Sequence, residues 1–116
     1  MDIKELSEKT GCNLEAALTR FGGMEALYVR LLKKFLEDQS FMQLKEAVEQ
    51  QDMQTVEHAA HTLKGVAGNL GLDVLQDSSA EIVQAVREGH SEQIEELFFK
   101  CSKDYDRIME AIREVL

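Results

Sequence analysis

Apolar residues recur at intervals of three and four along this chain, and this spacing constrains its fold more than any other feature. The clearest case is the last segment, which carries Ile94, Leu97, Phe98, Cys101, Tyr105, Ile108, Ile112 and Val115. Such a spacing places the apolar side chains on one face of an α-helix. No stretch of the sequence alternates apolar and polar residues in the manner of a strand, so the chain is predicted to be all-α.

Glycines and polar capping residues mark the ends of the predicted helices, because the sequence contains no proline. The glycines expected at helix ends are Gly11, Gly22, Gly23, Gly71 and Gly89. The expected N-caps are Asp2, Asn13, Asp52 and Ser91. These signals predict two short helices, over 3–9 and 14–21, and four longer helices, over 24–50, 53–70, 72–88 and 92–115. The pattern of the first long helix allows a bend near 38–41.

The predicted helices define a fold class. Four amphipathic helices joined by short connections favour an antiparallel up-down four-helix bundle, here preceded by the short N-terminal helices. A length of 116 residues suits a single domain over 1–116, and an apolar content of 44% is enough to form its core.

Charge and composition exclude several function classes. The chain has 13 Lys and Arg against 22 Asp and Glu, a net charge of −9, which argues against nucleic acid and membrane surfaces as partners. It has no membrane span and no signal peptide, and the distant Cys12 and Cys101 form no CxxC pair, so we expect reduced thiols in a cytoplasmic protein. The initiating methionine and the full last helix favour a free-standing chain.

The helix predicted over 53–70 presents a histidine on the face opposite its apolar stripe. At about 100° per residue, the apolar stripe lies roughly 180–260° from His61. It consists of Val56, Ala60, Leu63, Ala67 and Leu70. Within about 60° of His61 lie the residues of the polar face. They are Gln54, Glu57, His58, Lys64, Gly65 and Gly68.

Two glycines inside this helix need an explanation, since each costs it about 1 kcal/mol relative to alanine. Helical side chains lean toward the N-terminus, so a side chain at position 65 would cover the imidazole of His61. Gly65 therefore leaves the ring open, and Gly68 extends the bare strip by a turn. Lys64 leans the same way and can bring its ammonium group near whatever the ring carries.

This combination suits a histidine that accepts a bulky anion. A neutral imidazole is a competent nucleophile, and phosphoryl transfer needs mainly positioning and charge neutralisation, which Lys64 can supply. The sequence offers no carboxylate cluster for Mg²⁺ and no glycine-rich nucleotide loop. The chain is therefore predicted to hold a phosphoryl group but not to generate one from ATP, and so to have no kinase activity of its own.

The segment HTLKGVAGNLG, residues 61–71, resembles the signature of the histidine-containing phosphotransfer (HPt) domain family of two-component phosphorelays. FGGMEALYVRLLKKFLED, residues 21–38, is similar to the family's first long helix. EAVEQQDMQTVEHAAHTLKG, residues 46–65, is similar to the turn and helix that lead to its phosphorylated histidine. The resemblance covers roughly residues 14–115.

The resemblance implies a four-helix bundle that passes phosphoryl groups between receiver-domain aspartates, and we expect the chain to be a monomer. His61 would be the phosphoacceptor at Nε2, Lys64 would neutralise the phosphoryl group, and Gly65 and Gly68 would give receivers access. The implied partners are response-regulator receiver domains and a hybrid sensor histidine kinase. No cofactor is expected, since any Mg²⁺ would belong to the receiver. One departure is Val83, which stands where the family often has Gln or Glu beside the histidine. Gln84 is turned about 100° away.

Several alternatives stay open at this stage. The chain could be an interaction module that binds a receiver without phosphoryl chemistry. Glu57, His58 and His61 could form part of a metal site, although HExxH and further ligands at suitable spacing are lacking. His58 by itself could be a solvated or supporting residue. Lys64 could be a surface cation facing Glu57 or His61, and the two glycines could permit close helix packing. A docking patch could include Met24, Phe41 or Met42.

Overall fold

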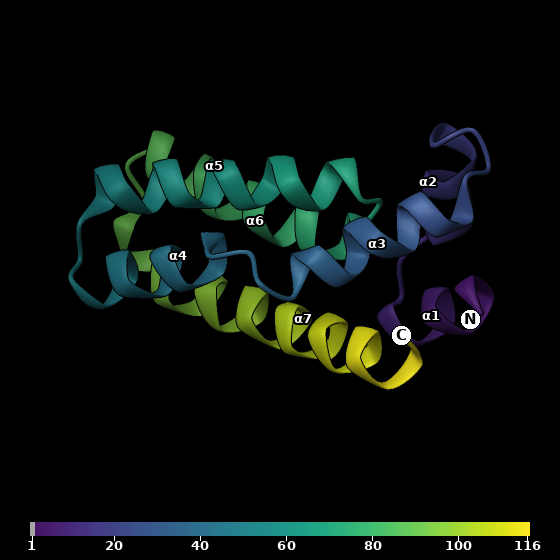
Figure 1. Cartoon of the computed structure of the whole chain (residues 1–116). Coiled ribbons are helices and arrows are strands. Elements are labelled where there is room, and N and C mark those ends of the chain that lie inside the picture. The colour runs from purple at the N-terminus through teal and green to yellow at the C-terminus, as the bar shows by residue number, and fades with distance from the viewer. Residues whose placement is uncertain (1) are drawn as a thin grey trace.

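A computed structural model describes residues 2–116, and all the regular structure that it contains is helical (Figure 1). The all-α prediction is therefore confirmed. In chain order the elements are α1 (Ile3–Thr10), α2 (Leu14–Arg20), α3 (Glu25–Phe35), α4 (Ser40–Glu49), α5 (Met53–Asn69), α6 (Asp73–Arg87), the 3₁₀ turn η1 (Ser91–Gln93) and α7 (Ile94–Val115). The helix that carries His61 begins where the sequence predicts and ends one residue earlier.

Most of the predicted helix ends are confirmed. The side chains of Asp2, Asn13 and Asp52 each accept a hydrogen bond from the backbone N–H three residues further on, at 3.2 to 3.3 Å. All five glycines expected at helix ends adopt positive φ angles. Ser91 is the exception, because it begins the turn η1 and its side chain caps neither η1 nor α7.

The prediction of one continuous helix over 24–50 is wrong. Residues 36–39 separate α3 from α4 at the place where the sequence pattern allows a bend. The Asp38 carboxylate accepts a hydrogen bond from the backbone N–H of Ser40 at 2.8 Å, and the Gln39 side-chain amide donates to the carbonyl of Glu37 at 3.1 Å. These local bonds compete with helical ones, so the backbone breaks instead of bending.

Helix α5 lies at the centre of the packing. It contacts α4 on one side and α6 on the other, α6 also packs on α7, and α7 contacts both α4 and α1. The short connections 50–52 and 70–72 reverse the chain direction on either side of α5. Figure 1 shows α4, α5, α6 and α7 along the long axis of the molecule, whose principal extents are 41 × 24 × 21 Å.

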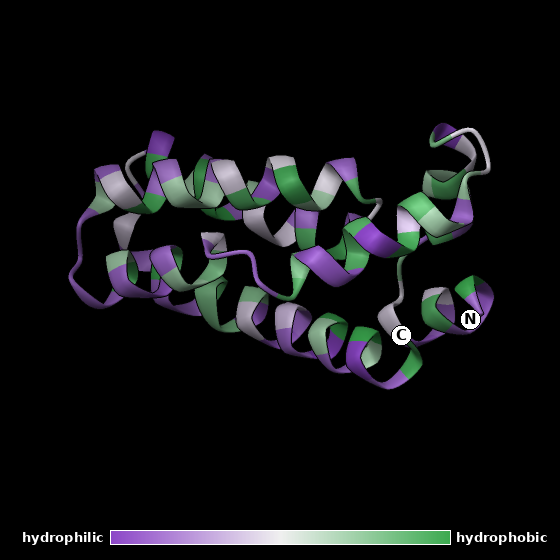
Figure 2. Ribbon diagram, viewed as in Figure 1, coloured by the Kyte–Doolittle hydropathy of each residue, from purple (hydrophilic) through white to green (hydrophobic). Residues whose placement is uncertain are grey.

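The core consists of the apolar faces on which these helices meet. In Figure 2 the hydrophobic segments lie mainly where helices face one another, and the hydrophilic ones lie at the loops and on the outer sides. Phe41 of α4 stacks on Tyr105 of α7 with ring centroids 3.9 Å apart. Both cysteines are buried, and burial raises the pKa of the Cys12 thiol to about 11 and also raises that of Cys101. Both thiols are therefore protonated and unreactive at neutral pH.

The N-terminal helices close one end of the molecule. Helix α1 packs on the C-terminal half of α7, where Arg107 donates from Nε to the carbonyl of Lys9 at 2.8 Å. Helix α2 packs against the turn between α5 and α6, where Ala17 faces Gly71. This turn is tied to α3 as well, because the Tyr28 hydroxyl donates to the carbonyl of Leu70.

Both the backbone conformation and the packing require a glycine at position 71. Substituting it by alanine is expected to lower the free energy of unfolding by about 2–4 kcal/mol. Its φ of 74° strains any side chain, and an added Cβ would also overlap the Cβ of Ala17. Gly89 provides the control, since it has a φ of 76° but no atom within 4 Å of an added Cβ. Gly89→Ala should cost only about 1 kcal/mol. Urea unfolding of both variants would measure the difference, and equal losses would contradict the proposed overlap.

Candidate functional site

His61 lies in the middle of α5 with its side chain exposed to solvent. Its neighbours Ala60 and Leu63 point the other way and are fully buried in the core. Nothing among residues 2–116 forms a hydrogen bond with the imidazole ring. The structure therefore places this histidine on the outer face of α5, opposite the core, as the sequence periodicity predicts.

A shallow hollow of about 400 Å³ adjoins His61. Three of its lining residues, Gln54, Glu57 and His58, belong to the polar face predicted from the sequence. They lie on the first turns of α5, on the N-terminal side of His61. The fifth lining residue is Arg87, from the last turn of α6.

Arg87 is the residue of this site that reasoning from the sequence missed. Its guanidinium Nε lies 3.4 Å from the Glu57 carboxylate, and both side chains are partly exposed, at 53% and 38%. The signal that could have found it is the short connection 70–72, which makes α6 antiparallel to α5 and brings the end of α6 beside the start of α5. The hollow beside His61 therefore contains a cation and an anion that are paired with each other.

Lys64 lies one turn beyond His61 and is half-buried. Its ammonium group forms no ion pair with any of residues 2–116. The structure does not support the alternative in which Lys64 faces Glu57, because the carboxylate of Glu57 is paired with Arg87. The Lys64 ammonium is thus available to an anion that arrives at the ring.

Gly65 faces open space. A Cβ added at this position would meet no atom within 4 Å, so the packing of the protein does not require a glycine there. This observation argues against the alternative in which Gly65 permits close packing between helices. It agrees with the interpretation that the missing side chain leaves the approach to His61 clear.

Gly68 differs from the prediction. It is half-buried, and an added Cβ would lie 2.8 Å from the side-chain amide nitrogen of Gln76, which reaches over it from α6. The carbonyl of Gly68 also accepts a hydrogen bond of 3.5 Å from Arg20. Gly68 therefore does not extend a bare strip beyond Gly65. The atom nearest to an added Cβ is the far end of the flexible Gln76 side chain, so this contact does not amount to the close helix packing that the sequence left open.

Of the side chains that the structure describes, none takes the place of the polar partner expected beside the ring. The contacts of Gln76 over Gly68 and of Arg87 with Glu57 fix how α6 lies along α5. His61 lies four residues after Glu57 on α5, and Val83 lies four residues before Arg87 on α6. Because the two helices are antiparallel, this register places His61 across from Val83. Val83 is only 2% exposed and packs in the core, while the adjacent Gln84 is exposed and forms no hydrogen bond with the ring.

Three other expectations concern a metal site, a docking patch and a membrane span. Within the described part of the chain, no group of three or more His, Cys, Asp or Glu side chains is arranged to hold a metal ion, so the metal-site alternative finds no ligand set there. Of the suggested docking residues, Met24 and Met42 are exposed, but Phe41 is buried against Tyr105 and cannot belong to a surface patch. Among the helices of residues 2–116, none is both long and apolar enough to span a membrane.

Comparison with known proteins supports the resemblance seen in the sequence. A family model described as Hpt domain matches residues 30–114, which include α4 to α7 and most of α3. Comparisons with curated proteins and with solved structures gave no match. The matched region covers most of the chain and contains His61, Lys64 and Arg87. The chain therefore belongs to the Hpt domain family.

Proposed function

We propose that this protein is a phosphorelay intermediate that accepts a phosphoryl group on His61 from the aspartyl phosphate of one receiver domain and passes it to another. Hpt domains are phosphocarrier modules of two-component signalling rather than kinases. The observation that carries the proposal for this chain is the exposed ring of His61 beside the open space at Gly65. A receiver docked over 54–68 would reach the ring without displacing any side chain from position 65.

The transfer step is a substitution at phosphorus. The lone pair of unprotonated Nε2 forms the nitrogen–phosphorus bond while the aspartyl oxygen leaves with the electrons of the phosphorus–oxygen bond. The Nδ1 proton stays on the ring. In such a reaction the protein aligns the reacting atoms and neutralises the negative charge of the transferred phosphoryl group. Lys64 supplies a cation for this neutralisation. Any Mg²⁺ would be held by the receiver, and the hybrid sensor kinase upstream would supply the phosphoryl group.

The wider setting is part of the same proposal. We take α4 to α7, with α3 prolonging α4, to act as the antiparallel up-down four-helix bundle of the family, in a single domain that also includes α1 and α2. The protein would work as a monomer in the cytoplasm, where the acidic surface would suit a receiver with a basic rim. The contacts among α4, α5, α6 and α7 support this arrangement.

Incubation with a labelled, phosphorylated receiver tests the proposal directly. Label should move to this protein and should be acid-labile and alkali-stable, as expected for phosphohistidine, and phosphorus NMR should show a nitrogen-bound phosphoryl group. A second candidate function is a receiver-binding module without chemistry, and the valine across from the ring favours it. Binding of the receiver without transfer of label would establish that second function and reject the first.

Lys64→Ala is expected to slow transfer by about tenfold or more, while receiver affinity changes by less than about threefold. The reason is that the ammonium group neutralises negative charge that is concentrated on the phosphoryl group during transfer. The binding energy of the receiver, in contrast, is spread over a whole interface. Single-turnover transfer rates and a binding titration would separate the two effects, and Lys64→Arg should restore much of the rate. Equal losses of rate and affinity would mean that the lysine mainly binds the partner.

The pair of Glu57 and Arg87 should set how much phosphoryl group His61 holds at equilibrium. A phosphoryl dianion on His61 would be repelled by Glu57 and attracted by Arg87, and an ion pair this exposed is weak enough to open. We expect Arg87→Gln to lower the equilibrium constant for loading His61 by about two- to fivefold, and Glu57→Gln to raise it similarly. The partition of label between receiver and protein at low salt would measure both. Shifts in the same direction would contradict this assignment.

A further inference from the structure

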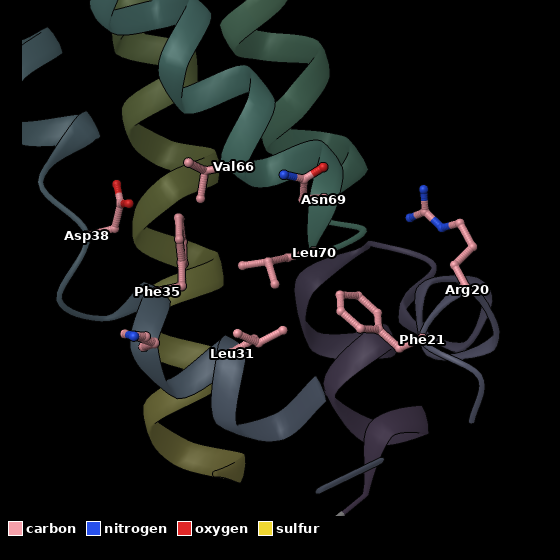
Figure 3. Close-up of a pocket in the computed structure, with 9 residues that line it drawn as sticks. Arg20, Phe21, Leu31, Phe35, Asp38, Val66, Asn69 and Leu70 are labelled. Carbon is pink, nitrogen blue, oxygen red and sulfur yellow. The ribbon is translucent and has the colours of Figure 1, made fainter. Parts of the chain in front are cut away.

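A second cleft, of about 600 Å³, lies between α3 and the C-terminal end of α5 (Figure 3). It shares no residue with the hollow beside His61. Its volume falls in the range of clefts that bind small molecules in proteins. Neither the proposed phosphoryl transfer nor the packing of the core accounts for it.

The interior of this cleft is apolar. Figure 3 shows the side chains of Phe21, Leu31, Phe35, Val66 and Leu70 around one common space. Phe35 and Leu70 are buried, and the other three are half-buried, so a ligand would find a hydrophobic wall on several sides. Burying a hydrocarbon chain or an aromatic ring against these side chains would be favourable.

The rim of the cleft carries positive charge. Arg20 and Lys34 both line it, and neither forms an ion pair with a residue of the described chain. Arg20 uses one of its five N–H donors, on the carbonyl of Gly68 at 3.5 Å. The one carboxylate at the rim, Asp38, already accepts a hydrogen bond of 2.8 Å from the backbone N–H of Ser40. The rim therefore carries two cations that form no ion pair and one carboxylate, a net charge of +1 (two minus one), in a protein whose net charge is −9.

From this juxtaposition we infer that the cleft binds a small amphiphilic anion, which has a hydrocarbon or aromatic body and a carboxylate or sulfonate head. The body would fill the space between α3 and α5, and the head would meet Arg20 or Lys34. Arg20 and Phe21 precede the region that matches the Hpt family model, so one wall of the site comes from outside that region. The inference does not depend on phosphoryl transfer by His61.

Octanoate and 1-octanol form a matched pair of probes, because they share the hydrocarbon chain and differ in the charge of the head. Each would be titrated, below the concentration at which it forms micelles or separates, into ¹⁵N-labelled full-length protein. We expect saturable shifts of the amide resonances around the cleft, among them those of Leu31 and Val66, with octanoate binding about tenfold tighter than octanol. Shifts that do not saturate, that lie elsewhere, or that are equal for the two probes would overturn the inference.

Substitutions at the rim and in the cleft sharpen the test. The double variant Arg20→Gln, Lys34→Gln should lose the roughly tenfold preference for octanoate and leave octanol binding unchanged. Lys33→Gln is the control, because Lys33 is an exposed cation of α3 that does not line the cleft. Leu31→Trp should weaken both probes by filling the space. If octanoate does not bind and Leu31→Trp weakens only receiver binding, the cleft receives a partner's side chain and the inference is wrong.

Discussion

Replacing His61 by glutamine is expected to reduce transfer from a phosphorylated receiver by at least ~1,000-fold, to background, without loss of folding stability. The amide of glutamine is not a nucleophile, and no other histidine occupies the centre of the polar face. Because the His61 side chain is exposed and forms no hydrogen bond with residues 2–116, its loss should change the free energy of unfolding by no more than about 0.5 kcal/mol. Gel detection of labelled protein and urea unfolding would measure the two effects.

His58→Gln provides the matched control for this prediction. His58 lies in the same hollow, three residues earlier on the same helix, and is also exposed. Its variant should accept label at close to the wild-type rate. Transfer that persists in His61→Gln but disappears in His58→Gln would move the phosphoacceptor to His58 and reject the assignment made above.

Replacing Gly65 by leucine is expected to slow transfer by roughly 100-fold or more while leaving the protein folded. A Cβ added at position 65 meets no atom of the protein within 4 Å, and leucine favours the helix over glycine by up to about 1 kcal/mol, so stability should hold or rise. The side chain would lean toward the N-terminus and over the ring of His61, where the receiver must approach. Single-turnover transfer and thermal unfolding of the same preparation would measure both consequences.

Two further variants distinguish obstruction of the ring from a general disturbance of α5. Gly65→Ala adds a single methyl group and should slow transfer less than leucine does. Thr62→Leu places the same leucine side chain at an exposed position of the same helix, in place of threonine and about 100° away from His61, and should slow transfer much less than Gly65→Leu. A normal transfer rate in Gly65→Leu would show that the glycine does not serve access to the ring.

The part of the site that the sequence predicts is the part that depends only on helix geometry. Once residues 53–69 form a helix, intervals of three and four residues place Glu57, His61 and Lys64 on one face, whatever that helix packs against. Caps such as Asp52 act within a few residues as well, which explains why most helix ends were predicted correctly.

Other features depend on how separate segments meet. The coverage of Gly68 by Gln76, the approach of Arg87 to Glu57 and the position of Val83 across from His61 all follow from the register of α6 along α5. Periodicity shows which face of a helix is apolar, but it does not show how far two such faces slide along one another when they pack. The sequence also did not predict the break at 36–39. The Asp38 side chain accepts a local hydrogen bond there, which competes with the backbone bonds of a helix that the apolar spacing alone would continue.

By itself, then, the sequence determined the helical class, the capped ends of most helices and the exposure of His61, because each arises from interactions between residues close together along the chain. Only the tertiary structure decided that an arginine from the next helix shares the hollow beside His61, that Gly68 is covered, and that Arg20 and Lys34 lie over one apolar cleft. These features bring together residues that are distant in sequence, and their positions are fixed by the packing of whole helices.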